Sequence, residues 1–366
     1  MQSARQRVSN AHVPYRGHLE PMHGLADNPG ALTGDLYLPP QLQADGPLVV
    51  VLHGCTQTAV NYAAAAGWLE LADRYGFAVL LPQQQRANNA NLCFNWFEPG
   101  DVQRDKGEPA SIKAMIDNAV ERLVIDLGNI FITGLSAGAA MAGTMLACYP
   151  EIFAGGGLIA GLPHGTASSM ATAFQQMSGG PRESARQLGE YVTAASDHDG
   201  PWPRVSIWHG DSDRTVSAVN GDATLAQWMT VHGLENVQSA SKVENNIHHR
   251  TWRDRNGLVA VEHVKVGGMG HGTPINLGAT NAVGKAMPFV LNTGIASSSH
   301  LLAFWGIGET LENQEPTSPS QPVNPPVAPP QPRASTRPAQ SPVFAQNETG
   351  VSKIINDALR AAGLLK

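Results

Sequence analysis

The chain is poor in cysteine, poor in charge and without any long apolar run. Three cysteines among 366 residues are too few for a disulfide framework and lack the spacing of a zinc site. We therefore expect no metal and no cofactor. No apolar run approaches the roughly 18 residues that span a bilayer, which predicts no transmembrane segment. The net charge of −6, without a basic run, argues against a nucleic-acid partner.

The pattern of the remaining residues predicts one large α/β domain with appendages. We expect an irregular segment over 1–30 and a catalytic domain over 31–308, in which strands and helices alternate around a mostly parallel sheet. Residues 309–347 are rich in proline and predict a stiff linker. Residues 348–366 carry apolar side chains at helical spacing and predict a short amphipathic helix. That helix either folds back as a tail or docks on a partner or polymer surface.

Local patterns place the main elements. Helices are expected over 59–75, 111–127, 139–147 and 218–232. Strands are expected over 48–52, 77–81 (stopped by Pro82), 129–133, 205–208, 250–252 and 259–266.

The pentapeptide Gly134-Leu135-Ser136-Ala137-Gly138 is the most informative motif. A β-branched strand precedes it and an apolar helix follows it, as in the nucleophile elbow of α/β-hydrolases. Glycines on both sides remove the Cβ atoms that would clash where the chain reverses. The context therefore predicts Ser136 as a catalytic nucleophile.

A serine nucleophile needs an imidazole base and a carboxylate that orients it, in the chain order Ser, acid, His. Asp211 and Asp213 both follow the strand 205–208, and we favour Asp213 because Asp211 directly after a glycine suits a turn. For the base we favour His271, which lies in a glycine-rich loop after the strand 259–266. The other downstream histidines are expected to be structural or on the surface: His232, His248, His249 and His263.

An oxyanion hole requires two backbone N–H donors. We assign one to Ala137 at the helix N-terminus and the other to Cys55, with Thr56 as the alternative. Cys55 and Cys93 sit in loops expected near this site, so in an oxidising compartment they either pair or remain free. Cys148 is expected to be a buried, inert thiol.

Several separate motifs, in order, resemble the poly(3-hydroxybutyrate) depolymerase family of esterases across residues 31–306. They are Leu52–Gln57, Ala72–Phe77, Cys93–Phe97, Gly134–Gly138 and Gly270–Pro274. The resemblance implies an α/β-hydrolase fold and a triad of Ser136, Asp213 and His271. Thr273 departs from the Trp-Pro that secreted members carry after the catalytic His-Gly. The resemblance also suggests an extracellular enzyme, whereas no signal peptide is visible at the N-terminus, which favours the cytoplasm.

The predicted activity is hydrolysis of carboxylic esters through an acyl-enzyme, with short-chain 3-hydroxyacyl esters, polymeric or oligomeric, as substrates. A feruloyl or acetylxylan esterase is the first alternative. A polymer- or partner-binding protein with vestigial activity is the second. Substrate contacts are expected from Trp96, Trp202 and Gln57, although Trp202 and Trp96 also fit a packing role.

Overall fold

The computed structural model describes residues 15–25 and 27–308, which belong to one compact unit, Met1–Glu309. The predicted linker over 309–347 and helix over 348–366 lie outside the described residues. Among the helices of the described part, none is long and apolar enough to cross a membrane.

The elements alternate along the chain as the sequence predicts. The strands are β1 (His18–Pro21), β2 (Thr33–Leu38), β3 (Gly46–Leu52), β4 (Ala78–Gln83), β5 (Ile125–Leu135), β6 (Gly155–Ile159), β7 (Arg204–Gly210), β8 (Ala240–Glu244), β9 (Ile247–Arg253), β10 (Val259–Val266), β11 (Thr273–Ile275) and β12 (Val290–Asn292). The helices are α1 (Ala59–Ala65), α2 (Trp68–Tyr75), the 3₁₀ turn η1 (Pro99–Asp101), α3 (Gly107–Arg122), α4 (Ala137–Cys148), α5 (Met170–Gly179), α6 (Ala185–Thr193), α7 (Val219–Val231) and α8 (Ser297–Trp305).

Ten strands form one sheet in the order β1-β2-β4-β3-β5-β6-β7-β10-β9-β8. The six central strands from β4 to β10 run parallel, and the outer strands pair antiparallel. Parallel strands present their carboxyl ends at one edge, where ligands of open α/β sheets bind. This arrangement confirms the predicted mostly parallel sheet.

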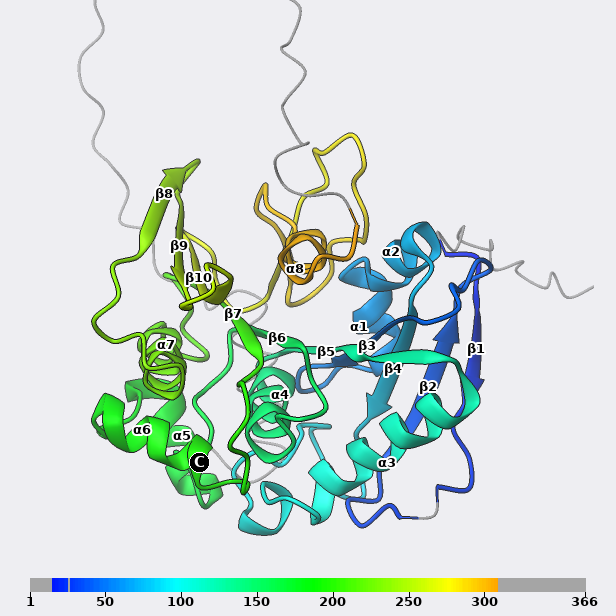
Figure 1. Ribbon diagram of the computed structural model, residues 1–366, viewed down its shortest axis with the longest axis horizontal. Coiled ribbons are helices and arrows are strands. Elements are labelled where there is room, and N and C mark those ends of the chain that lie inside the picture. The colour runs from blue at the N-terminus through cyan, green and yellow to red at the C-terminus, as the bar shows by residue number, and fades with distance from the viewer. Residues whose placement is uncertain (1–14, 26, 309–366) are drawn as a thin grey trace, which may run out of the picture. The chain divides into compact units, whose positions relative to one another are not determined.

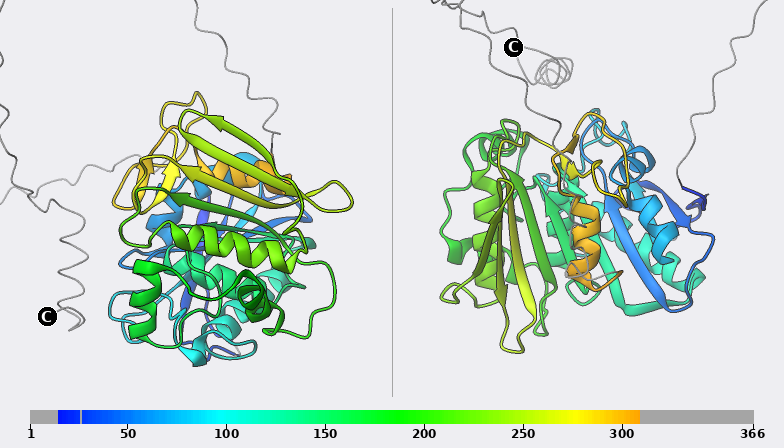
Figure 2. Two further views of the ribbon diagram at one scale, coloured as in Figure 1. Left: turned by 90° about the vertical axis from the view of Figure 1, so that its left-hand side faces the viewer. Right: turned by 90° about the horizontal axis from the view of Figure 1, so that it is seen from above.

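Helices cover both faces of the sheet, as Figure 1 and the two turned views of Figure 2 show. One apolar core lies between the sheet and α3, α4, α6 and α7, and contains the fully buried Trp228. The second lies between the sheet and α1, α2 and α8, where the rings of Trp68, Phe131 and Trp305 stack. The central strands are therefore buried on both faces, which explains their continuous apolar runs.

The prediction that residues 1–30 are irregular is wrong for part of that segment. Residues 18–21 form β1, which pairs antiparallel with β2, and Met22 is buried in the first core. The Gly30 N–H also donates to Ser111 Oγ at 2.8 Å. The short strand was missed because its four residues, His-Leu-Glu-Pro, include no β-branched or aromatic side chain and end in a proline.

Three helices or strands also have bounds that differ from the predicted ones. The helix predicted over 59–75 is two helices, because Gly67 adopts a φ of 86° between α1 and α2. The helix predicted over 111–127 runs over 107–122, since its last predicted residues already form β5. Pro82 does not stop β4, which runs to Gln83: the pairing with β3 ends at Leu80, and on the other side Pro82 lies opposite Gly34 of β2.

Candidate active site

Ser136 lies on a strained turn between β5 and α4. Its φ is 59° and ψ is −120°, a conformation that a non-glycine residue rarely adopts. A Cβ on Gly134 would lie 2.4 Å from the Gly138 backbone, and one on Gly138 would lie 2.4 Å from the Leu52 carbonyl oxygen. The two glycines thus let the strand, the helix and β3 approach closely enough to form the elbow that the sequence predicts.

Asp213 and His271 meet at the same edge of the sheet. His271 Nδ1 lies 2.7 Å from Asp213 Oδ2, and both side chains are buried. Asp213 follows β7 and His271 follows β10, which is the parallel neighbour of β7. A Cβ on Gly210 would lie 2.2 Å from the Met269 carbonyl oxygen, so this glycine allows the two loops to pack against each other.

The Asp213 carboxylate is held in its charged form. Burial alone would raise its pKa, but hydrogen bonds from His209 and His271 outweigh burial and keep the pKa below its ordinary value. Oδ1 also accepts the Thr215 and Val216 N–H groups, each at 2.9 Å. A charged, fixed carboxylate beside Nδ1 favours the ring tautomer whose Nε2 is able to accept a proton.

Asp211 has the turn role that its position suggests. Its exposed carboxylate accepts the Gly268 N–H at 2.7 Å and the Ser212 hydroxyl at 3.0 Å. It therefore braces the loop that carries His271 without contacting the imidazole.

In the loop after β3 the backbone N–H of Thr56 is already bonded, whereas that of Cys55 is free to donate. The Thr56 N–H already donates to the Asn91 carbonyl at 2.7 Å. Among the residues that the structure describes, the N–H groups of Cys55 and Ala137 have no hydrogen-bond partner. Ala137 is the first residue of α4, where the helix dipole adds a partial positive charge.

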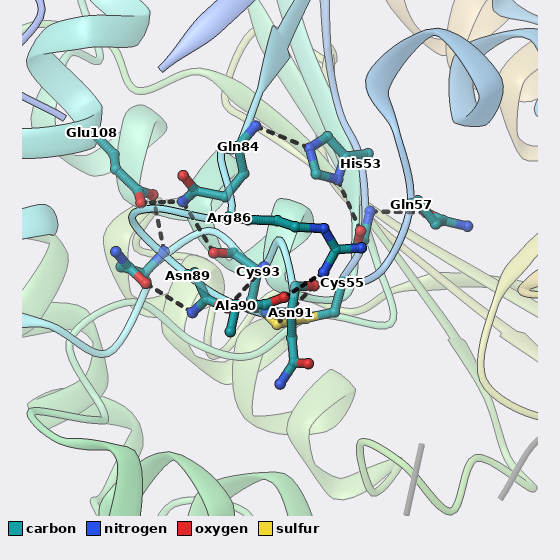
Figure 3. The surroundings of a disulfide bond; sticks show 12 residues. His53, Cys55, Gln57, Gln84, Arg86, Asn89, Ala90, Asn91, Cys93 and Glu108 are labelled. Carbon is teal, nitrogen blue, oxygen red and sulfur yellow. Dashed lines mark hydrogen bonds between the residues drawn. A yellow bond between two sulfur atoms is a disulfide. The ribbon is translucent and has the colours of Figure 1, made fainter. Parts of the chain in front are cut away.

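A disulfide joins Cys55 to Cys93, with the Cα atoms 4.2 Å apart (Figure 3). The bond ties the loop after β3 to the loop after β4. Gln84 anchors the second loop by donating to the Cys93 carbonyl at 3.0 Å and to Glu108 at 2.5 Å. The disulfide therefore restrains the segment that carries the Cys55 N–H. Of the two predicted states of these cysteines, paired or free, the structure shows the paired one.

Cys148 is free and buried, and burial raises the pKa of its thiol to about 12.

The three residues expected to touch substrate have different surroundings. Trp96 is buried and belongs to an apolar cluster with Ala137, the residue after Ser136. Both polar atoms of the Gln57 side-chain amide are hydrogen-bonded: Oε1 accepts the Gly54 N–H at 2.9 Å, and Nε2 donates to the Pro288 carbonyl at 3.4 Å. Its amide thus shapes the loop after β3.

Trp202 is not brought to the site. It precedes β7 at the amino end of that strand, whereas Asp213 follows the carboxyl end. Its ring packs edge-on against His198 and Trp228. Trp202 therefore has the packing role, which corrects its assignment as a substrate contact.

Two neighbours of the Asp213–His271 pair were not predicted from the sequence. The buried His209 places Nε2 3.4 Å from Asp213 Oδ2 and 3.0 Å from the Val216 carbonyl oxygen. Phe289, from the loop before β12, packs edge-on against the His271 ring with the centroids 5.9 Å apart. The position of His209 four residues before Asp213 was the available signal for the first. No local signal pointed to Phe289.

The downstream histidines that were set aside are structural, but not all lie on the surface. His263 is buried and His232 is half-buried, and burial lowers their pKa values to about 3 and about 4, respectively. His248 is exposed. His249 is half-buried and lies within β9, whereas the sequence placed both residues before a strand.

Comparison with known proteins identifies relatives over most of the chain. The family model described as Esterase PHB depolymerase matches residues 32–249. Poly(3-hydroxyalkanoate) depolymerase C of Paucimonas lemoignei is 43% identical over 282 residues, covering 76% of this chain and 68% of that protein. The acetylxylan esterase of Coprinopsis cinerea is 29% identical over 267 residues, covering 70% of each.

A solved structure shares the fold. The acetyl xylan esterase from Aspergillus awamori superposes with a TM-score of 0.68 at 22% identity, covering 80% of this chain and all of that one (100%). The predicted α/β-hydrolase fold is thereby confirmed.

Proposed function

The chain belongs to the PHB depolymerase family of esterases and is a carboxylic ester hydrolase, and on this premise we propose that Ser136, His271 and Asp213 form its catalytic triad. The observation that carries the proposal is the buried 2.7 Å contact between His271 Nδ1 and Asp213 Oδ2. The apolar cluster beside the nucleophile supports it, since Ala137 next to Ser136 and Val216, whose N–H binds Asp213, both belong to it.

In this mechanism Ser136 Oγ attacks the ester carbonyl while His271 Nε2 takes the hydroxyl proton. Asp213 orients the imidazole and stabilises the imidazolium that forms. The N–H groups of Ala137 and Cys55 donate to the oxyanion of the tetrahedral intermediate. The imidazolium then protonates the departing alcohol, and a water molecule activated by His271 hydrolyses the acyl-enzyme.

The favoured substrates are short-chain 3-hydroxyacyl esters, as polymer or oligomer. The support is the 43% identity to a poly(3-hydroxyalkanoate) depolymerase. Trp96 would form part of the apolar wall against the acyl chain, because it lies in the cluster with Ala137. The second candidate, an acetylxylan or feruloyl esterase, is favoured by relatives with those names at 27–29% identity.

The first test is hydrolysis of p-nitrophenyl butyrate by the wild type, Ser136→Ala and a control, Ser178→Ala, which alters an exposed hydroxyl on α5. We expect Ser136→Ala to lower kcat by roughly 10⁴–10⁶-fold, as for other serine hydrolases. The control should keep wild-type turnover. If Ser136→Ala retained kcat within about tenfold of the wild type, it would exclude the covalent mechanism at this serine.

The substrate class is decided by comparing kcat/KM for 3-hydroxybutyrate oligomers, acetylated xylo-oligosaccharides and methyl ferulate. A preference for the first would support the depolymerase assignment, and a preference for either of the others would replace it.

Removing residues 309–366 tests the second alternative, a polymer- or partner-binding protein with vestigial activity. An enzyme keeps its turnover of soluble esters, whereas a protein whose main role is binding through the helix predicted over 348–366 loses that binding.

A further inference from the structure

Three side chains outside the triad converge on one point between the sheet and α8. His249 comes from β9, Glu262 from the neighbouring β10 and His300 from α8. His249 Nε2 lies 2.5 Å and His300 Nε2 lies 2.9 Å from the same oxygen, Glu262 Oε1. The possible ligand atoms of the three residues all lie within 4.8 Å of one another.

The neighbours of the cluster bury Glu262 and fix the orientation of its carboxylate. Glu262 is almost fully buried, and its second oxygen, Oε2, accepts the Ser206 hydroxyl. Ser206 Oγ in turn accepts the Trp208 indole N–H at 2.8 Å. This chain of hydrogen bonds leaves Oε1 turned toward the two imidazoles. Carboxylate ligands of metals are commonly held by such outer hydrogen bonds, which orient them.

The His300 ring is positioned independently of Glu262. It packs edge-on against Trp208, with the centroids 5.0 Å apart, and against His249 at 5.3 Å. In Figure 2 (right) the orange helix α8, which carries His300, runs alongside the half of the sheet that contains β7, β10 and β9. The His249 side chain is 27% exposed, which gives solvent a path to the cluster.

Two imidazoles and one carboxylate are a ligand set that suits zinc and neighbouring divalent metals. Metal–ligand bonds of 2.0–2.1 Å in a tetrahedron place the ligand atoms about 3.3 Å apart. Oε1 lies 2.5 Å from Nε2 of His249 and 2.9 Å from Nε2 of His300, so an ion would need each nitrogen to move away from Oε1 by less than about 1 Å. Both rings would then coordinate through Nε2 with the proton on Nδ1, and a water molecule would complete the tetrahedron.

We propose that His249, Glu262 and His300 bind one divalent transition-metal ion of the zinc class. The ion would be structural, because none of its ligands belongs to the proposed triad. It would tie α8 to β9 and β10, and β10 leads directly into the loop that carries His271. The ligands are 13 and 38 residues from Glu262 along the chain, so no sequence motif for metal binding marks them.

The test uses the full-length protein, freed of metal with a chelator and dialysed. Zn²⁺ is titrated by calorimetry and by competition with a chromophoric chelator, and Co²⁺ is added as a spectroscopic probe. We expect one equivalent of bound Zn²⁺, a visible Co²⁺ absorption of low-coordinate geometry, and a rise in Tm on adding Zn²⁺.

The informative variant is His249→Asn, because this ligand is only half-buried and its loss should leave the fold intact. The matched control is His248→Asn, which alters the exposed neighbour on the same strand. We expect His249→Asn to lower the affinity for this equivalent by at least about tenfold and to abolish the Co²⁺ absorption. His248→Asn should bind as the wild type does. If the wild type takes up no stoichiometric Zn²⁺, or His249→Asn binds it equally well, the cluster is a hydrogen-bonded one only and the proposal fails.

Discussion

His271 Nδ1 contacts Asp213 Oδ2 at 2.7 Å although the two residues are 58 positions apart in the chain. The contact exists because β7 and β10 are parallel neighbours, so the loops that follow them start from the same edge of the sheet. Backbone bonds join these loops as well, from the Ser212 N–H to the Met269 carbonyl and from the Asp211 N–H to the Val266 carbonyl. The pair is thus held by the sheet rather than by the side chains alone.

Replacing Asp213 by Asn should leave the fold intact and lower kcat for p-nitrophenyl butyrate by about 10⁴-fold, because the imidazole then takes the wrong tautomer. The matched control is Asp211→Asn, whose amide oxygen still accepts the Gly268 N–H and which should change kcat only slightly. Steady-state kinetics on the three proteins measures this. Equal losses in both variants would reassign the acid.

Opening the Cys55–Cys93 disulfide should lower kcat more than it raises KM. The bond restrains the loop that presents the Cys55 N–H, and this donor acts mainly on the transition state. The loss should stay below the roughly 10²–10³-fold that removal of a whole oxyanion donor costs. Kinetics of Cys93→Ser and of the reduced wild type measure it, with Cys148→Ala as the control that removes only the free thiol. Unchanged kcat in Cys93→Ser would show that the loop keeps its position without the bond.

Adding a methyl group at Gly138 should destabilise the protein by about 1–3 kcal/mol or more, since the new Cβ would be forced against the β3 backbone. That atom would lie 2.4 Å from the Leu52 carbonyl oxygen, whereas a Cβ on Gly143 in the same helix would find its nearest heavy atom at 3.8 Å. Gly143→Ala should therefore be neutral or stabilising by up to about 1 kcal/mol. Urea denaturation of both variants gives the comparison. A Gly138→Ala protein as stable as Gly143→Ala would contradict the close approach at the elbow.

Glu108 should make the protein less stable as the pH rises. Burial, helped by the negative charge of Asp101, raises its pKa from 4.5 to about 8. The folded state therefore binds more protons than the unfolded state between these values, and the free energy of unfolding falls as the pH increases from about 4.5 to about 8. This stabilisation is fully present below the unfolded pKa and is lost as the pH passes the folded one.

The measurement is the free energy of unfolding by urea at several pH values for the wild type and Glu108→Gln. The difference between the two proteins isolates Glu108 from the buried histidines, whose lowered pKa values act in the opposite direction. Relative to the wild type, Glu108→Gln should gain stability from pH 5 to pH 8. Glu98→Gln, at an exposed position, serves as the control. A pH-independent difference between wild type and Glu108→Gln would show that the carboxyl is already ionised in the folded protein.

The sequence alone predicted the parts of the candidate site whose signal is local. Gly134–Gly138 identifies the elbow because a tight turn between a strand and a helix needs glycines at fixed offsets. Given the order Ser, acid, His that α/β-hydrolases share, local strand and loop patterns were enough to select Asp213 and His271 as candidates. The strand β1 was missed, because four residues that end in a proline carry too little signal.

Only the tertiary structure decided the contacts between distant segments. The fold brings Cys55 and Cys93 together in a disulfide and gives the Thr56 N–H and the Gln57 amide hydrogen-bond partners. It also places Trp202 at the amino end of β7, away from Asp213. It also brought His209 beside Asp213 and gathered His249, Glu262 and His300. The physical reason is that sequence patterns report which face of an element is apolar and where the chain turns. The side chains that then meet across the sheet depend on strand order and register, which are set by the packing of the whole domain.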